Sequence, residues 1–216
     1  TYLPMETEVF FNLPPRKIAG CAIPLFSIRS EGSCGTGDFG DLKSFIDWAA
    51  DTGQQAVQLL PINDTSGNGG WMDSYPYSAI SIYAFHPMYI DLRQLSEPED
   101  KEEAQLFETE RRKLNAYLRT AFRQEGDEVL SSEEFLSFFA HNESWLQPYA
   151  AFCYLRDLNH TPDFHQWSKY QTYDAAEIAK LCNPENEVYP KIAFHYYIQY
   201  QLHKQLLDAG SHARQR

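Results

Sequence analysis

The chain has 216 residues, of which 43% are hydrophobic and 15% aromatic, enough to bury a substantial core in one large domain or in one and a half smaller ones. Its net charge of −12, from 18 basic and 30 acidic residues, argues against nucleic acid and anionic membranes as partners. No stretch approaches the length of a transmembrane span, and the first residues lack the basic and apolar regions of a signal peptide.

Cysteine usage indicates a reducing compartment. Cys21, Cys34, Cys153 and Cys182 lie far apart and show none of the paired spacings of metal or redox sites. We therefore expect free thiols in a cytoplasmic protein, with no metal and no cofactor.

The first structured part reads as strand–helix–strand. After an irregular lead-in (1–17), residues 20–28 form an apolar run typical of a strand buried on both faces. Asp38 is placed to cap a helix that Gly53 ends, and a second apolar run follows at 56–62. This order predicts a parallel pair of strands with a right-handed crossover.

Inside this unit, residues 35–40 spell the glycine pattern G-x-G-x-x-G of dinucleotide sites, and Asp64 follows at a distance that suits a ribose-binding acid. Two features count against that reading. The glycines come several residues after the strand, and Asp38 would place a carboxylate among amides that should bind pyrophosphate. We expect the glycines to serve a tight turn and a close helix–sheet contact instead.

The middle of the chain is predicted to be mainly helical. A short extended piece is expected near 88–92, followed by a charge-rich helix within 97–124. A second helix would begin with a capping box formed by Ser131 and Glu134, and a third would have Pro148 in its first turn.

The last part contains a short helix at 175–181 and an amphipathic helix from Ile192 to about Leu207. His195, His203 and His212 are predicted to be solvent-side or capping residues, because their spacing suits no single metal site.

The loop after the second strand has the composition of a sugar-binding segment. Trp71, Asp73, Ser74, Tyr75 and Tyr77 combine ring faces for C–H surfaces with groups that hydrogen-bond hydroxyls. The alternative is a surface loop whose aromatic residues only cover the end of the sheet.

Two parallel strands and many helices fall short of the eight strand–helix units, in about 250 residues, of a closed barrel. We predict an α/β fold, the N-terminal portion of a (β/α)₈ TIM barrel with a helical insertion. Residues 1–17 would be a lead-in, 18–93 the first strand–helix units, 94–190 the mainly helical insertion, and 191–216 a barrel helix.

Several motifs together resemble the 4-α-glucanotransferases of glycoside hydrolase family 77, which include the amylomaltases. The likeness extends from about Ile18 to Ala209, and the loop resembles most the cytosolic plant disproportionating isoform and its bacterial relatives. The motifs are Gly35–Gly40, Gln58–Pro61, Pro76–Ser78, His86–Ile90, Trp145–Ala150 and the helix 192–205.

The resemblance implies transfer of α-1,4-glucosyl units between maltose, malto-oligosaccharides or related glucans by a retaining double displacement. Such chemistry needs two carboxyl groups about 5 Å apart. Tyr77 matches the tyrosine that stacks on the reacting sugar, and Asp73 and Ser74 beside it would bond sugar hydroxyls.

No acid of this chain matches the family's catalytic motifs, so we assign no catalytic residue and expect the 216 residues alone to be inactive. An α-glucan is the expected partner, and exposed strand edges would allow self-association. A stand-alone carbohydrate-binding or structural module is the alternative function, and a dinucleotide-binding domain is a further one.

Overall fold

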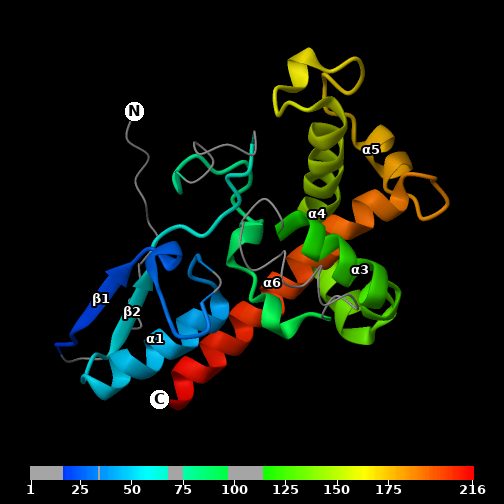
Figure 1. Ribbon diagram of the computed structural model, residues 1–216. Coiled ribbons are helices and arrows are strands. Elements are labelled where there is room, and N and C mark those ends of the chain that lie inside the picture. Colours follow the sequence, from blue (N-terminus) through cyan, green and yellow to red (C-terminus); the bar gives the residue numbers. More distant parts are fainter. Residues whose placement is uncertain (1–16, 34, 68–74, 97–113) are drawn as a thin grey trace, which may run out of the picture.

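Two parallel strands open the fold in the computed structural model, which describes residues 17–33, 35–67, 75–96 and 114–216. Strand β1 (Gly20–Ile23) pairs with β2 (Ala56–Leu59), with Gly20 opposite Ala56, and helix α1 (Phe39–Asp51) connects them (Figure 1). The predicted strand–helix–strand unit is therefore confirmed.

Both strands are shorter and more exposed than predicted. β1 stops before Pro24, whose missing N–H cannot join a ladder, and the 3₁₀ helix η1 (Leu25–Ser27) follows. Along each strand exposed and half-buried residues alternate, and the half-buried Ile23 and Leu59 contact the core. The prediction that residues 20–28 form a strand buried on both faces was wrong, because the described chain covers only one face of this strand.

Helix α1 begins and ends where its local chemistry predicts. The Asp38 carboxylate accepts hydrogen bonds from the backbone N–H groups of Gly40 and Asp41, and the Asp41 side chain closes a capping box. After the helix, Gly53 adopts a positive φ of 80°, a backbone conformation that favours glycine.

The helical part consists of α3 (Leu114–Ser131), α4 (Glu133–Asn159), α5 (Ala175–Leu181) and α6 (Tyr189–Gln215). The short helix predicted at 175–181 and the closing helix are confirmed, and the closing helix is longer than predicted. Most of the helix predicted within 97–124 precedes Leu114 and lies outside the described residues.

Three predicted boundaries were wrong. Ser132, not Ser131, caps α4 by accepting a hydrogen bond from the N–H of Phe135 at 3.2 Å. Pro148 lies inside α4, so the second and third predicted helices are one. The helix continues past Pro148 although proline has no N–H to donate. In place of an extended piece near 88–92 there are two 3₁₀ helices, η3 (Pro87–Tyr89) and η4 (Leu92–Gln94).

Helix α6 connects the two halves of the structure. In Figure 1 its red end lies beside α1, whereas its orange beginning lies near α4 and α5. Its apolar residues belong to two core clusters: Phe194 and Tyr197 to the one that includes residues of α1 and α3, and Ile192 and Tyr196 to the one that includes residues of α4 and α5. Helix α6 therefore contributes buried residues to both hydrophobic clusters.

Two buried glutamines of α6 bind the chain that follows β2. Gln199 accepts a hydrogen bond from the N–H of Phe85 at 2.9 Å and donates one to its carbonyl at 2.8 Å. Gln205 binds both backbone groups of Asp91 in the same way, at 2.7 and 3.0 Å. Each glutamine thus fixes a segment 114 positions earlier in the sequence.

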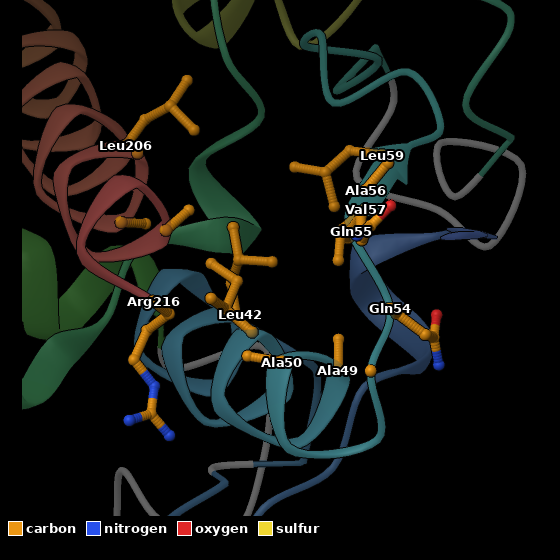
Figure 2. Close-up of a pocket in the computed structure, with 15 residues that line it drawn as sticks. Leu42, Ala49, Ala50, Gln54, Gln55, Ala56, Val57, Leu59, Leu206 and Arg216 are labelled. Carbon is orange, nitrogen blue, oxygen red and sulfur yellow. The ribbon is translucent and has the colours of Figure 1, made fainter. Parts of the chain in front are cut away.

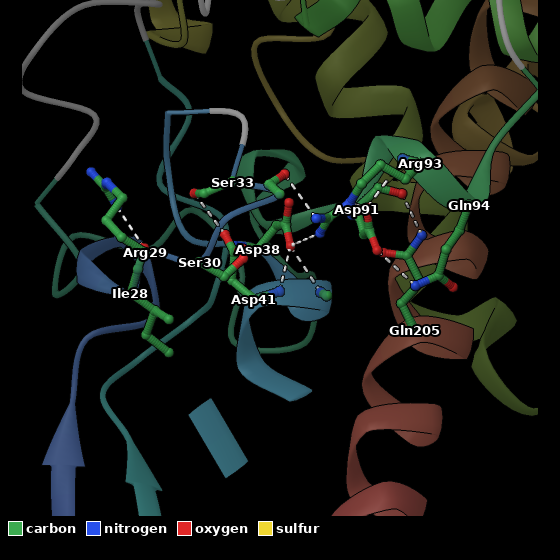
Figure 3. A network of polar contacts seen from close by, with 12 residues as sticks. Ile28, Arg29, Ser30, Ser33, Asp38, Asp41, Asp91, Arg93, Gln94 and Gln205 are labelled. Carbon is green, nitrogen blue, oxygen red and sulfur yellow. Dashed lines mark hydrogen bonds and ion pairs between the residues drawn. The ribbon is translucent and has the colours of Figure 1, made fainter. Parts of the chain in front are cut away.

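An ionic network joins the start of α1 to the segment after η3 (Figure 3). Arg93 bonds the carboxylates of Asp38 and Asp91, at 3.0 and 2.5 Å, and donates to the Gly32 carbonyl at 2.8 Å. The buried Asp41 carboxylate accepts hydrogen bonds from the hydroxyls of two serines in the preceding loop, Ser30 and Ser33.

Burial is the main reason why the pKa of Asp38 is raised from 3.8 to about 6. The hydrogen bond with Asp41 and the charge of Arg93 lower this pKa, whereas the charges of Asp91 and Asp41 raise it. Asp38 consequently changes its charge in a pH range where an ordinary aspartate is already ionised.

We expect Gln205→Leu to lower the free energy of unfolding by about 2–5 kcal/mol, because it leaves two buried backbone groups of Asp91 without partners. Urea unfolding measures this as a lower midpoint with an unchanged slope. The matched control is Gln215→Leu, an exposed position on the same helix, which should leave the midpoint nearly unchanged. Equal midpoints for wild type and Gln205→Leu would refute the role of this contact.

Asp38→Asn should change how stability depends on pH while keeping the helix cap, since Asn caps as well as Asp. With a raised pKa, the folded state binds this proton more tightly than the unfolded state. The stabilisation that this proton gives the folded state is therefore complete below about pH 3.8 and is lost as the pH rises through about 6. Between pH 4 and 7.5, the melting temperature of Asp38→Asn should rise relative to that of wild type. A constant difference over this range contradicts the raised pKa.

Candidate functional site

The described residues between β2 and η3, 60–67 and 75–86, form the closed base of a loop, which we call the β2 loop. Asn63 and Phe85 form an antiparallel bridge, and the N–H of Asp64 donates to the Ala84 carbonyl at 2.8 Å. The N–H of Ile80 donates to the Asp64 carbonyl at 2.8 Å. Both ends of the loop are therefore fixed to each other.

A buried carboxylate lies in this base. Asp64 is fully buried, and its Oδ1 accepts hydrogen bonds from the N–H and hydroxyl of Ser66 at 2.8 and 2.6 Å. Its Oδ2 accepts a hydrogen bond from the Tyr149 hydroxyl of α4 at 2.6 Å. Burial raises the pKa of Tyr149, with smaller contributions from Cys153 and Asp64, so this hydroxyl remains a donor.

Further contacts tie the base to the helices. Arg156 of α4 donates from Nη1 to the Ser66 carbonyl at 2.5 Å. Gln199 of α6, which binds both backbone groups of Phe85, also donates to the Tyr149 hydroxyl at 3.3 Å. The β2 loop thus rests on α4 and α6 through buried polar side chains.

Tyr77, the predicted stacking residue, is exposed on this loop. The exposed fraction is 62% for Tyr77 and 56% for Tyr75, and their ring centroids lie 5.5 Å apart. The two other predicted substrate-binding residues, Asp73 and Ser74, lie outside the described residues, as does Trp71. A large exposed ring on a loop with a fixed base suits a stacking contact with an apolar ligand face.

A second aromatic contact occupies the returning arm of the loop. The rings of Tyr83 and Trp145 stack with centroids 5.8 Å apart and planes inclined by 22°, and Trp145 donates to the Asn142 side chain at 2.9 Å. Tyr83 is 57% exposed, so the loop presents ring surface on both of its described arms.

A polar hollow of about 520 Å³ lies beside the foot of the loop, between α3, α4 and α6. His195 lines it and is buried, so the prediction of a solvent-side or capping histidine was wrong for this residue. Burial lowers the pKa of His195 to about 3, which keeps the imidazole neutral at pH 7. Its Nε2 lies 4.0 Å from the Asp157 carboxylate of α4.

The other two histidines lie elsewhere. His203 packs against the Phe138 ring with centroids 4.9 Å apart, and His212 contacts the Asp47 carboxylate at 2.8 Å. In the part of the chain that the structure describes, no group of three or more His, Cys, Asp or Glu side chains could hold a metal ion.

The glycine pattern at 35–40 serves packing. A side chain at Gly37 would lie 2.1 Å from the Leu25 carbonyl, and one at Gly40 would lie 2.2 Å from the Arg93 guanidinium. The Asp38 carboxylate already occupies the amides at the start of α1. This arrangement leaves the helix start without room or free donors for a pyrophosphate, and Asp64, buried against Tyr149, is not placed to bind a ribose.

An apolar hollow of about 590 Å³ lies between α1, β2 and α6 (Figure 2). Leu42, Val57, Leu59 and Leu206 line it, and Arg216 lies at its edge. Its lining side chains are apolar except for those of Gln54, Gln55 and Arg216.

Sequence reasoning missed Asp64, Tyr149 and Gln199 as residues that shape this site. The available signal was the presence of Gln199, Gln201 and Gln205 among the aromatic and aliphatic residues of the closing helix, where polar side chains need buried partners. Among the described helices, none is long and apolar enough to cross a membrane.

The sequence comparisons agree on one family. A family model described as 4-α-glucanotransferase matches residues 23–216. Over 216 residues the chain is 43% identical to the 4-α-glucanotransferase DPE2 of Oryza sativa subsp. japonica, covering 94% of this chain and 23% of that protein. A 4-α-glucanotransferase of Chlamydia muridarum is 31% identical and is matched over 98% of this chain and 43% of its own length.

Solved structures show the same fold. An amylomaltase from Streptococcus agalactiae in complex with acarbose superposes with a TM-score of 0.74 at 21% identity, over 93% of this chain and 41% of that one. An amylomaltase from Corynebacterium glutamicum gives a TM-score of 0.64 at 20% identity, over 92% and 28%.

The chain spans less than half the length of each of these relatives. The family match covers most of the present sequence and includes the β2 loop and α6. The resemblance predicted from the motifs is confirmed: the chain belongs to the 4-α-glucanotransferases, glycoside hydrolase family 77.

Proposed function

We propose that this chain supplies part of the glucan cleft of a 4-α-glucanotransferase, which transfers α-1,4-glucosyl units between maltose, malto-oligosaccharides or related glucans. One observation supports this most strongly: Tyr77 is exposed on a loop that follows the carboxyl end of β2 and whose base is fixed to α4 and α6. In α/β barrels, substrates bind at the carboxyl ends of the strands.

The reaction would be a retaining double displacement. In the first step a carboxylate nucleophile displaces the leaving glucan, whose oxygen is protonated by a carboxylic acid. In the second step the deprotonated acid takes the proton of the acceptor's 4-hydroxyl, and that oxygen displaces the carboxylate from the glucosyl unit. We propose that Tyr77 stacks on the sugar that becomes bound and that Asp73 and Ser74 bond its hydroxyls. Both catalytic carboxyl groups would come from residues outside these 216.

We also propose that β1, α1, β2 and α6 are units of a (β/α)₈ barrel. Residues 18–93 would supply its first strand–helix units, 94–190 a helical insertion, and 191–216 a barrel helix, after a lead-in at 1–17. The likeness to amylomaltase structures supports this division, because it extends over 93% of the chain.

A cytoplasmic location is part of the proposal. Cys21, Cys153 and Cys182 are free thiols in the structure, which suits a reducing compartment, whereas Cys34 lies outside the described residues. The net charge of −12 suits a protein that binds neutral glucans and neither nucleic acid nor anionic lipid.

Removal of the Tyr77 ring should weaken glucan transfer. In the full-length protein, Tyr77→Ala should lower kcat/KM for maltotriose disproportionation about 5- to 30-fold, the factor that corresponds to about 1–2 kcal/mol. Tyr77→Phe should retain most activity because the ring face remains. The control Tyr173→Ala removes a ring of similar exposure, 67%, far from the β2 loop in sequence. Equal glucose release by wild type and Tyr77→Ala excludes the stacking role.

We propose further that the isolated 216 residues self-associate. In the described part of the chain each strand has one unpaired edge, and the apolar hollow of Figure 2 opens beside β2. Sedimentation should show species larger than the 25.0 kDa monomer. Val57→Lys, which puts a charge in the hollow, should shift the population toward monomer, and Leu136→Lys on the exposed face of α4 should not. A monodisperse wild-type monomer would contradict this proposal.

A further inference from the structure

We propose that Tyr149 and Arg156, both on α4, are positioning residues for glucan binding: they hold the base of the β2 loop and so determine where Tyr77 meets the sugar. The helical insertion would then act on the substrate through the loop, without contacting it. This inference rests on the proposed function of Tyr77, and the experiment below separates the two.

The Asp64 carboxylate divides its two oxygens between the loop and α4. Oδ1 accepts hydrogen bonds from the N–H and the hydroxyl of Ser66, which lies on the outgoing arm of the loop, the arm that leaves β2. Oδ2 accepts a hydrogen bond from the Tyr149 hydroxyl at 2.6 Å. The backbone of Asp64 meanwhile bonds Ala84 and Ile80 on the returning arm. One buried residue therefore joins both arms to α4.

Arg156 makes a second connection to the outgoing arm. Its Nη1 donates to the Ser66 carbonyl at 2.5 Å, while Nε and Nη2 both bond Asp157 Oδ1, at 2.9 and 2.8 Å. Asp157 thus fixes the plane of the guanidinium, and only 14% of the Arg156 side chain is exposed. A lysine at this position keeps the charge but not this geometry.

The part of α4 that carries Tyr149 is well packed. Tyr149 and its neighbours Ala150 and Ala151 belong to the core cluster that α4 shares with α5 and α6. Since closely packed cores resist displacement, the two contacts give the loop base a defined position.

Energetics favours a role in placement over a role in stability. A buried polar pair gains little compared with apolar residues of the same shape, although removing one partner is costly. The Asp64–Tyr149 hydrogen bond is directional, so it holds the loop in one position relative to α4. An apolar contact would define that position less well. A displaced loop binds the sugar less tightly in the ground state and in the transition state by the same amount. Such a uniform loss of binding raises KM more than it changes kcat.

The experiment compares variants of the full-length protein in maltotriose disproportionation. Tyr149→Phe should raise KM about fivefold, equivalent to about 1 kcal/mol, with kcat changed less than about twofold. Arg156→Lys should act in the same direction. The matched control is Tyr154→Phe on the same helix, because within the described residues the Tyr154 hydroxyl makes no hydrogen bond, while its ring lies under Lys191.

Amide hydrogen exchange gives a second readout that needs no activity. In Tyr149→Phe and Arg156→Lys, peptides covering residues 75–86 should exchange faster than in wild type, whereas peptides of α1 should not change. If Tyr149→Phe does not fold, Arg156→Lys decides the question.

Two results would overturn the proposal. One is an unchanged KM with unchanged exchange at 75–86, even if the melting temperature falls, since that leaves only a stabilising role. The other is an equal effect of Tyr154→Phe. An inactive wild type would refute the proposed function instead, and hydrogen exchange would still decide whether α4 holds the loop.

Discussion

The chain that follows β2 is held in place by hydrogen bonds that its backbone makes with α6. The buried side chains of Gln199 and Gln205 bind the backbone N–H and carbonyl groups of Phe85 and Asp91, respectively. Because α6 also packs against α1 and against α4, the chain after β2 is fixed relative to both of these helices.

This constraint explains how an exposed loop can serve recognition. The β2 loop is closed at its base by backbone bonds and is attached to two helices by Asp64, Tyr149, Arg156 and Gln199. Among its described residues, the rings of Tyr75, Tyr77 and Tyr83 are exposed to solvent. Fixed supports and an accessible aromatic face together suit a ligand such as a glucan, whose recognition needs both stacking and a constant position.

Local chemistry was readable from the sequence, and long-range pairing was not. Asp38 and Gly53 marked the ends of α1 correctly, because capping depends on residues a few positions apart. Pro148 suggested a helix start that does not exist, since a long helix packed on its neighbours tolerates one missing donor. The bond between Asp64 and Tyr149 joins residues 85 positions apart, and no local pattern announces it. The family resemblance supplied Tyr77, which composition alone could not distinguish from Tyr75.

The central claim is that the β2 loop, held by α4 and α6, presents Tyr77 to an α-glucan. A crystal structure of the full-length protein with a bound malto-oligosaccharide tests it most directly. The Tyr77 ring should contact the C–H face of a glucosyl unit at about 4 Å, with the Tyr149–Asp64 hydrogen bond intact. A glucan bound in the cleft while the Tyr77 ring stays in solvent would contradict it.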